Sequence, residues 1–167
     1  MNIYADNAAT TKLSPRAKDA MMPYFDELFG NPSSLHTPGQ LANQALESAR
    51  ERIAAALGAA PAEIYFTSGG SEADVQAITS AAKFGERKGK KHIISTAFEH
   101  HAVLHTLENL EKQGFEVTLL PVHEDGVVRL EDLEEALRPD TALVTVMFAN
   151  NEIGTLQPIR EIGALCR

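Results

Sequence analysis

Tryptophan is absent from the 167 residues, and cysteine occurs once, as Cys166. A single thiol excludes an internal disulfide and any metal site built from several cysteines. A lone cysteine inside a predicted helix is most often a small apolar core residue, so we expect Cys166 to be buried. Candidate chemistry must be sought in other residue types.

Positive charge is scarce, since 15 Lys and Arg residues stand against 23 Asp and Glu residues and the formal net charge is −8. This argues against nucleic acid as a partner, because its phosphates need a basic surface. A small anion is still possible, because backbone dipoles bind phosphate on acidic proteins too.

Long apolar runs are also lacking. Stretches such as Leu143–Ala149 are far shorter than the roughly 20 residues that span a bilayer, and the first residues lack the basic and apolar parts of a signal peptide. We therefore expect a cytoplasmic protein without a membrane partner.

What the sequence does contain is a regular alternation of helix and strand patterns, without repeats or obvious linkers. This alternation predicts an α/β fold with a mainly parallel sheet between helical layers. The run 142–148 is almost wholly apolar, which predicts a strand buried on both faces. The expected helices are 14–28, 37–58, 72–84, 101–113, 130–137 and 158–167, and the expected strands are 64–67, 92–96, 115–121 and 142–148.

The stretch Phe66–Asp74 contains two glycines, Gly69 and Gly70, between a predicted strand and a predicted helix. Glycines let a ligand approach the backbone, and the free N–H groups of a first helical turn, with the Ser71 hydroxyl, can hold a phosphate. The stretch matches neither a Walker loop nor a dinucleotide fingerprint. On these residues alone, an ordinary glycine-rich turn is an equally open interpretation.

A histidine, His100, directly follows the predicted strand 92–96. At that strand end an imidazole can stack on a planar ring or move a proton near neutral pH, although a solvent-exposed histidine at a helix start fits as well. His101 and His105 have the i, i+4 spacing of metal ligands, but no third ligand is evident, so we expect no metal.

Two amides, Asn150 and Asn151, follow the apolar strand and could bind a ring hydroxyl or a carboxylate, or simply form a turn with Gly154. The loops 4–11 and 30–36 are rich in small and polar residues, and composition does not decide whether they line a pocket or cap helices.

Taken together, five stretches resemble the cysteine desulfurases, which belong to the class V aminotransferase group of pyridoxal 5'-phosphate (PLP) enzymes. They occur in the same order and at similar spacing as in that family, and the resemblance runs over essentially the whole chain. The stretches are Asp6–Thr11, Gly30–Ser34, Thr67–Glu72, Glu99-His100 and Asn150–Gly154.

The resemblance implies PLP as cofactor, L-cysteine as substrate, and alanine and an enzyme persulfide as products. The persulfide would pass to an iron–sulfur scaffold or another sulfur acceptor, and the enzyme would be a homodimer. It implies that Gly70 and Ser71 bind the cofactor phosphate, that His100 stacks on the ring and assists proton transfer, and that Asn151 lies near the ring hydroxyl and substrate carboxylate.

The resemblance also implies a PLP-dependent transferase-like large domain that is incomplete here. Residues 1–13 would line the active site, and residues 14–167 would form the N-terminal part of the domain. The family sheet has seven strands in the order 3-2-4-5-6-7-1, of which this chain would contain strands 1 to 4. Strand 1, residues 64–67, would then lack its neighbour.

Some features depart from the family pattern. Val75 stands where the family often has Asn, and Ser71 and Phe98 stand where it often has Thr. The aspartate that pairs with the pyridine nitrogen, the lysine that attaches PLP and the cysteine that carries the persulfide are expected beyond the equivalent of Arg167. Two alternatives remain open: a selenocysteine lyase or other class V lyase or aminotransferase, and a truncated, non-catalytic paralogue.

Overall fold

The computed structural model describes residues 3–167, which form two compact units, one ending at Phe66 and one running from Thr67 to Arg167. Each unit is described by itself. Among the described residues, no helix combines the length and the apolar character needed to cross a bilayer.

The first unit is helical and begins with α1 (Pro15–Met21), which continues as the 3₁₀ helix η1 (Met22–Phe25). The Ser14 hydroxyl accepts a hydrogen bond from the Ala17 N–H at 3.1 Å and so caps α1. The predicted helix to residue 28 is shorter in the structure. Pro23 explains the early end, because proline has no N–H and clashes with the preceding turn.

The long helix α2 spans Thr37–Leu57, close to its predicted bounds. His36 caps its start through Nδ1, which accepts from the Gly39 N–H at 3.3 Å. Gly58 ends it with a φ of 67°, a left-handed conformation that glycine adopts without strain. The 3₁₀ helix η2 (Pro61–Glu63) follows.

The predicted strand 64–67 is wrong, because the structure has no strand there. Ile64, Tyr65 and Phe66 suit a strand by residue type, but a strand exists only when a neighbour takes up its backbone hydrogen bonds. Here Ile64 offers its carbonyl to the Arg50 guanidinium, and Tyr65 is exposed. No described residue supplies a pairing strand, which agrees with the missing neighbour that the family topology implied.

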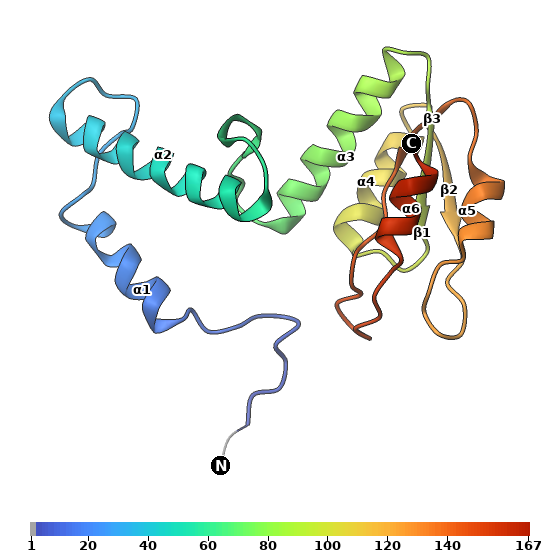
Figure 1. The fold of residues 1–167 in the computed structure, drawn as a ribbon, viewed down its shortest axis with the longest axis horizontal. Helices are drawn as coiled ribbons and strands as arrows, with labels where there is room; N and C mark the ends of the chain where they lie inside the picture. The colour runs from blue at the N-terminus through green and yellow to red at the C-terminus, as the bar shows by residue number, and fades with distance from the viewer. Residues whose placement is uncertain (1–2) are drawn as a thin grey trace. The chain divides into compact units, whose positions relative to one another are not determined.

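The second unit is an α/β layer structure (Figure 1). Its three strands are all parallel and lie in the order β2-β1-β3, which confirms the predicted fold class and the predicted order 3-2-4 of the corresponding strands. In chain order the elements are α3 (Gly70–Glu86), β1 (His92–Thr96), α4 (His101–Glu111), β2 (Glu116–Leu120), α5 (Leu130–Ala136), β3 (Thr141–Val144) and α6 (Ile159–Leu165).

Neighbouring residues of β1 point to opposite faces of the sheet, and each face has its own core. Ile93 packs with Ile78 and Ala82 of α3 and with apolar residues of α4. Ile94 packs with Leu133 of α5 and Ile162 of α6. The side-chain alternation of a strand therefore produces the three layers, with α3 and α4 covering one face and α5 and α6 the other.

Two predictions for the end of the chain are wrong. β3 ends at Val144 rather than 148 and is only half-buried, because β1 is the sole strand that pairs with it among the described residues. Cys166 is exposed rather than buried. It is the C-cap residue of α6, one turn beyond Ile162, and does not join the core in which Ile162 packs.

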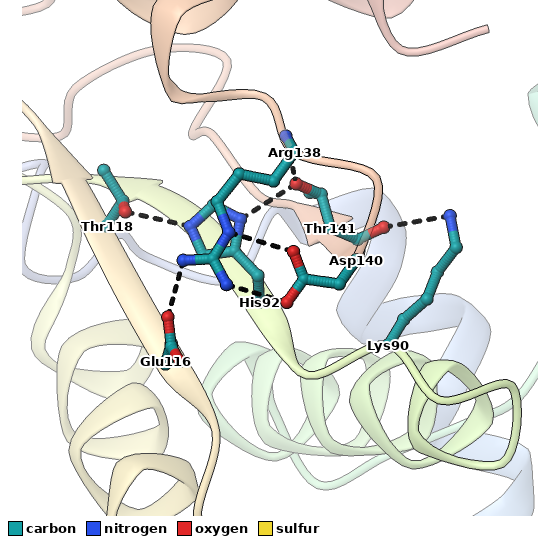
Figure 2. A network of polar contacts seen from close by, with 7 residues as sticks. All are labelled: Lys90, His92, Glu116, Thr118, Arg138, Asp140 and Thr141. Carbon is teal, nitrogen blue, oxygen red and sulfur yellow. Dashed lines mark hydrogen bonds and ion pairs between the residues drawn. The ribbon is translucent and has the colours of Figure 1, made fainter.

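A polar network occupies the edge where the strands begin (Figure 2). The imidazole of His92 is completely buried between two hydroxyls, with Nδ1 2.8 Å from Thr141 Oγ1 and Nε2 2.9 Å from Thr118 Oγ1. Burial lowers the pKa of His92. Beside it the Arg138 guanidinium pairs with Glu116 and Asp140, which links the starts of β2 and β3, and the His92 bonds join β1 to both.

Candidate functional site

At the opposite edge of the sheet, the three strands end and continue into loops. The strands are parallel, so Thr96, Leu120 and Val144 all end at this edge. The segment 97–100 leaves β1 here, and the segment 145–151 leaves β3 here. Ligands of open parallel sheets bind at such an edge.

The helix α3 begins at this edge with Gly70, two residues earlier than predicted. Glu72 turns back toward Ser68 and accepts hydrogen bonds from its N–H and its hydroxyl, both at 2.6 Å. These bonds lower the pKa of Glu72. None of residues 3–167 accepts a hydrogen bond from the N–H of Gly70 or Ser71.

The backbone at Gly69 and Gly70 is open. A Cβ built on either residue would meet no atom within 4 Å, so a ligand can approach the main chain there. Gly69 is extended, with φ 167° and ψ 178°, and α3 begins at the next residue, so the N–H groups of its first turn have no acceptor within the helix. Unpartnered N–H groups at an accessible first turn suit a phosphate.

His100 is the N-cap of α4. Its Nδ1 accepts a hydrogen bond from the Ala102 N–H at 3.1 Å, so the proton of the neutral ring resides on Nε2. The imidazole is thereby fixed by its own helix and keeps its second nitrogen available at the surface.

His100 borders two pockets of the second unit. One, of about 400 Å³, lies along α3 and α4 and is also lined by Ser71. The other, of about 440 Å³, is also lined by Glu99 and Asn151. Ser71 and Asn151 are 80 residues apart in the sequence, but each shares a pocket with His100.

The two neighbouring amides differ. Asn150 is buried, and its Oδ1 accepts from the N–H groups of Glu152 and Ile153 at 2.9 and 3.0 Å while its Nδ2 donates to the Phe98 carbonyl at 3.3 Å. Its side chain is used to form the loop. Asn151 is exposed and has no hydrogen-bond partner among residues 3–167, so it is the amide available to a ligand.

Sequence reasoning missed the role of Glu99 in this geometry. Its side chain is 7% exposed, and its Oε1 accepts from Thr96 Oγ1 at 3.0 Å and from the Met147 N–H at 2.7 Å. Burial raises the pKa of Glu99, although these two bonds act in the opposite direction. The only hint in the sequence was an acidic residue directly beside His100.

The neighbouring histidines His101 and His105 also line the pocket along α3 and α4, but they form no metal site among the described residues. The rings of His101 and His105 stack on the surface of α4 with centroids 5.6 Å apart, and within residues 3–167 no three His, Cys, Asp or Glu side chains are grouped as a metal site. A further pocket, of about 710 Å³, belongs to the first unit. It is lined mostly by apolar side chains and contains none of the predicted site residues.

The model of the family "Aminotransferase class-V" matches residues 3–167, that is, nearly the entire chain. The chain belongs to the class V aminotransferase family. Among curated relatives, "Cysteine desulfurase IscS" of Clostridium botulinum is 53% identical over 165 residues, which cover 99% of this chain and 41% of that protein. The chain therefore spans about two fifths of the length of such relatives.

Solved structures of the family agree with the fold. A "NIFS-LIKE PROTEIN" superposes with a TM-score of 0.95 at 42% identity, over 99% of this chain and 45% of that one. "SspA in complex with cysteine" superposes with a TM-score of 0.89 at 42% identity, over 95% of this chain and 46% of that one. The α/β layers described above are thus part of the class V aminotransferase fold.

Proposed function

We propose that the protein that contains this chain is a PLP-dependent cysteine desulfurase, and that residues 67–167 supply one wall of its cofactor pocket. The single observation that carries the proposal is the position of His100, between a pocket shared with Ser71 and a pocket shared with Asn151. The identity to a named cysteine desulfurase supports the choice of reaction.

The residues at the start of α3 suit the phosphate of PLP. The N–H groups of Gly70 and Ser71 have no acceptor within residues 3–167, and the positive end of the helix dipole favours an anion. The Ser71 hydroxyl adds a further donor. When bound, PLP supplies an electron sink that makes the substrate's carbon–sulfur bond breakable.

His100 and Asn151 would act on the substrate side of this pocket. Because the Ala102 N–H occupies Nδ1 of His100, the proton that this residue holds or moves is the one on Nε2. Asn151 would donate its amide protons to a carboxylate or a ring hydroxyl. Asn150 keeps the loop that carries Asn151 in shape.

In the full reaction, the carbon–sulfur bond of L-cysteine breaks, alanine leaves, and the sulfur bonds to an enzyme thiol as a persulfide. We place that thiol and the lysine that attaches PLP in the part of the relatives that this chain does not match. An iron–sulfur scaffold or another thiol protein would accept the sulfur. We further propose a homodimer that works in the cytoplasm, with residues 1–13 lining its active site.

The test is an assay of the full-length protein with PLP and L-cysteine. Alanine and, with a thiol reductant present, sulfide should form in equal amounts, and omission of PLP should abolish both. A strong preference for L-selenocysteine over L-cysteine would favour a selenocysteine lyase instead. Absence of turnover with either substrate, despite bound PLP, would contradict the proposal and favour another class V reaction or a non-catalytic protein.

A further inference from the structure

Glu99 accepts a hydrogen bond just beyond the point where the backbone bonds between β1 and β3 end. The Thr145 N–H donates to the Ile94 carbonyl at 2.9 Å, which continues the parallel ladder one residue beyond β3. In a regular strand the N–H two residues on, that of Met147, points the same way. Here it donates to the Glu99 carboxyl group at 2.7 Å instead of a strand carbonyl.

A second contact fixes the same two loops. Asn150 Nδ2 donates to the Phe98 carbonyl at 3.3 Å, one residue before Glu99. The segment that leaves β1 is therefore fastened to the segment that leaves β3 at two points. His100 directly follows the first point on one segment, and Asn151 directly follows the second point on the other.

Burial of a carboxyl group costs free energy, and the hydrogen bonds of Glu99 offset only part of that cost. Both of its hydrogen bonds reach Oε1, from Thr96 and Met147. None of residues 3–167 forms a hydrogen bond with Oε2. This atom is not fully enclosed, so it keeps some contact with solvent. An apolar side chain would fill this place at lower cost but could not accept from Met147.

We propose that Glu99 is a positioning residue, whose carboxyl oxygen holds the loop of His100 against the loop of Asn151. The inference rests on the proposed function, because the two loops matter through the groups that they carry. Glu99 itself need not touch substrate or cofactor. Its role is to accept a hydrogen bond from the Met147 N–H at the point where the sheet ends.

The test compares three variants of the full-length, PLP-loaded protein. Glu99→Gln keeps an oxygen that accepts both hydrogen bonds, Glu99→Asp keeps the charge but is one methylene too short to reach Met147, and Glu99→Leu has no acceptor. Glu111→Ala, on the exposed end of α4, is the matched control. The readouts are hydrogen exchange over residues 145–151, the carbethoxylation rate of His100 by peptide mass, the visible absorbance of PLP, and kcat and KM.

We expect Glu99→Gln and the control to stay within about twofold of wild type in every readout. Glu99→Asp and Glu99→Leu should show at least tenfold faster exchange over residues 145–151, altered His100 reactivity and PLP absorbance, and at least tenfold lower kcat with little change in KM. If Glu99→Gln is as impaired as Glu99→Leu, the charge or the proton matters rather than the acceptor, and the proposal is wrong. Wild-type exchange in Glu99→Asp would also overturn it.

The two proposals can fail separately. If the wild-type protein lacks desulfurase activity, the proposed function fails, while hydrogen exchange and His100 carbethoxylation still measure whether Glu99 holds the loops. If Glu99→Leu does not fold, the comparison of Glu99→Gln with Glu99→Asp remains decisive, because both keep a polar group of similar size.

Discussion

Ser68 donates two hydrogen bonds to Glu72, one from its N–H and one from its hydroxyl, both at 2.6 Å. This pair closes the start of α3 on the side of the preceding turn, much as a capping box does. It keeps the Glu72 carboxylate on Ser68 and leaves the N–H groups of Gly70 and Ser71 without acceptors among the described residues. The same helix start therefore combines a hydrogen-bonded carboxylate, that of Glu72, with vacant N–H donors.

The vacant donors lead to a prediction for phosphate binding. Ser71→Ala in the full-length protein should weaken PLP binding by about 1–3 kcal/mol, or roughly 5- to 150-fold in Kd, because one bond to a charged phosphate is lost. Retention of PLP during dialysis and its Kd by absorbance titration measure the effect. Ser80→Ala, exposed on the same helix, is the control. Equal affinity of the Ser71 variant and wild type would remove the hydroxyl from the phosphate site.

His100 has a structural task and a proposed chemical task, and two variants separate them. His100→Asn keeps a side chain suited to cap α4, so its melting temperature should match wild type, whereas His100→Ala loses the cap and should melt at a lower temperature. Both variants should keep some bound PLP, lose most turnover, by 10²-fold or more, and shift the cofactor absorbance.

The control for His100 is His123→Ala, because His123 is an exposed histidine that pairs with Asp132 and lines neither of the two pockets that His100 borders. It should turn over at the wild-type rate. Wild-type turnover in His100→Asn would show that the imidazole takes no part in the reaction.

The buried His92 predicts a pH dependence of stability. Burial lowers its pKa, so the unfolded chain binds a proton at higher pH than the folded chain does. Stability from His92 is then complete above the unfolded pKa, near 6.5, and falls as the pH drops from there toward the lowered folded value. The Thr118 and Thr141 hydroxyls can partner the neutral ring without a charge.

Urea unfolding between pH 7.5 and pH 5 measures this dependence. His92→Phe should be less stable than wild type at pH 7.5, because Thr118 and Thr141 each lose a hydrogen bond to the imidazole, but should lose less stability on acidification. His105→Ala, which changes an exposed histidine, should keep the wild-type slope. Parallel pH profiles for wild type and His92→Phe would contradict the lowered pKa.

The sequence predicted those helices and strands whose residue pattern is local. It failed where the formation of a strand depends on a partner strand far away in the sequence. Gly58 ends α2 close to its predicted end, and the neighbouring residues Ile93 and Ile94 pack into separate cores on the two faces of the sheet. Residues 64–67 have strand-forming side chains, but no local feature reveals whether a neighbouring strand is present. The same holds for β3, whose predicted second half leaves the sheet beyond its last bond to β1.

For the candidate site, the sequence likewise indicated some residues and missed another. His100, Ser71 and Asn151 stood out because each follows or precedes a predicted element at a strand end. Glu99 did not, since its key partner, the Met147 N–H, is 48 residues away and is a backbone group without a sequence signal. The roles of the predicted residues remain predictions that the variants above test.

The lysines of the second unit give the last prediction: the 167-residue chain alone will not attach PLP covalently at the candidate site. None of the five matched stretches contains a lysine. Lys90 and Lys91 directly precede β1, Lys83 and Lys88 lie at the end of α3, and Lys112 follows α4. All five therefore lie at the edge where the strands begin, about 16 Å from the edge that carries His100, given a five-residue strand.

Several of these lysines are also engaged at that edge. Lys83 and Lys91 both pair with Glu86, at 3.2 and 2.9 Å, and Lys90 donates to the Thr141 carbonyl. The purified chain, mixed with PLP, reduced with borohydride and digested, should yield no stoichiometric PLP-labelled lysine peptide, and dialysis should remove its visible absorbance. The full-length protein, treated in parallel, should be labelled at one lysine outside these residues. Stoichiometric labelling of any lysine in the isolated chain, stable to dialysis before reduction, would show that the chain supplies its own attachment site.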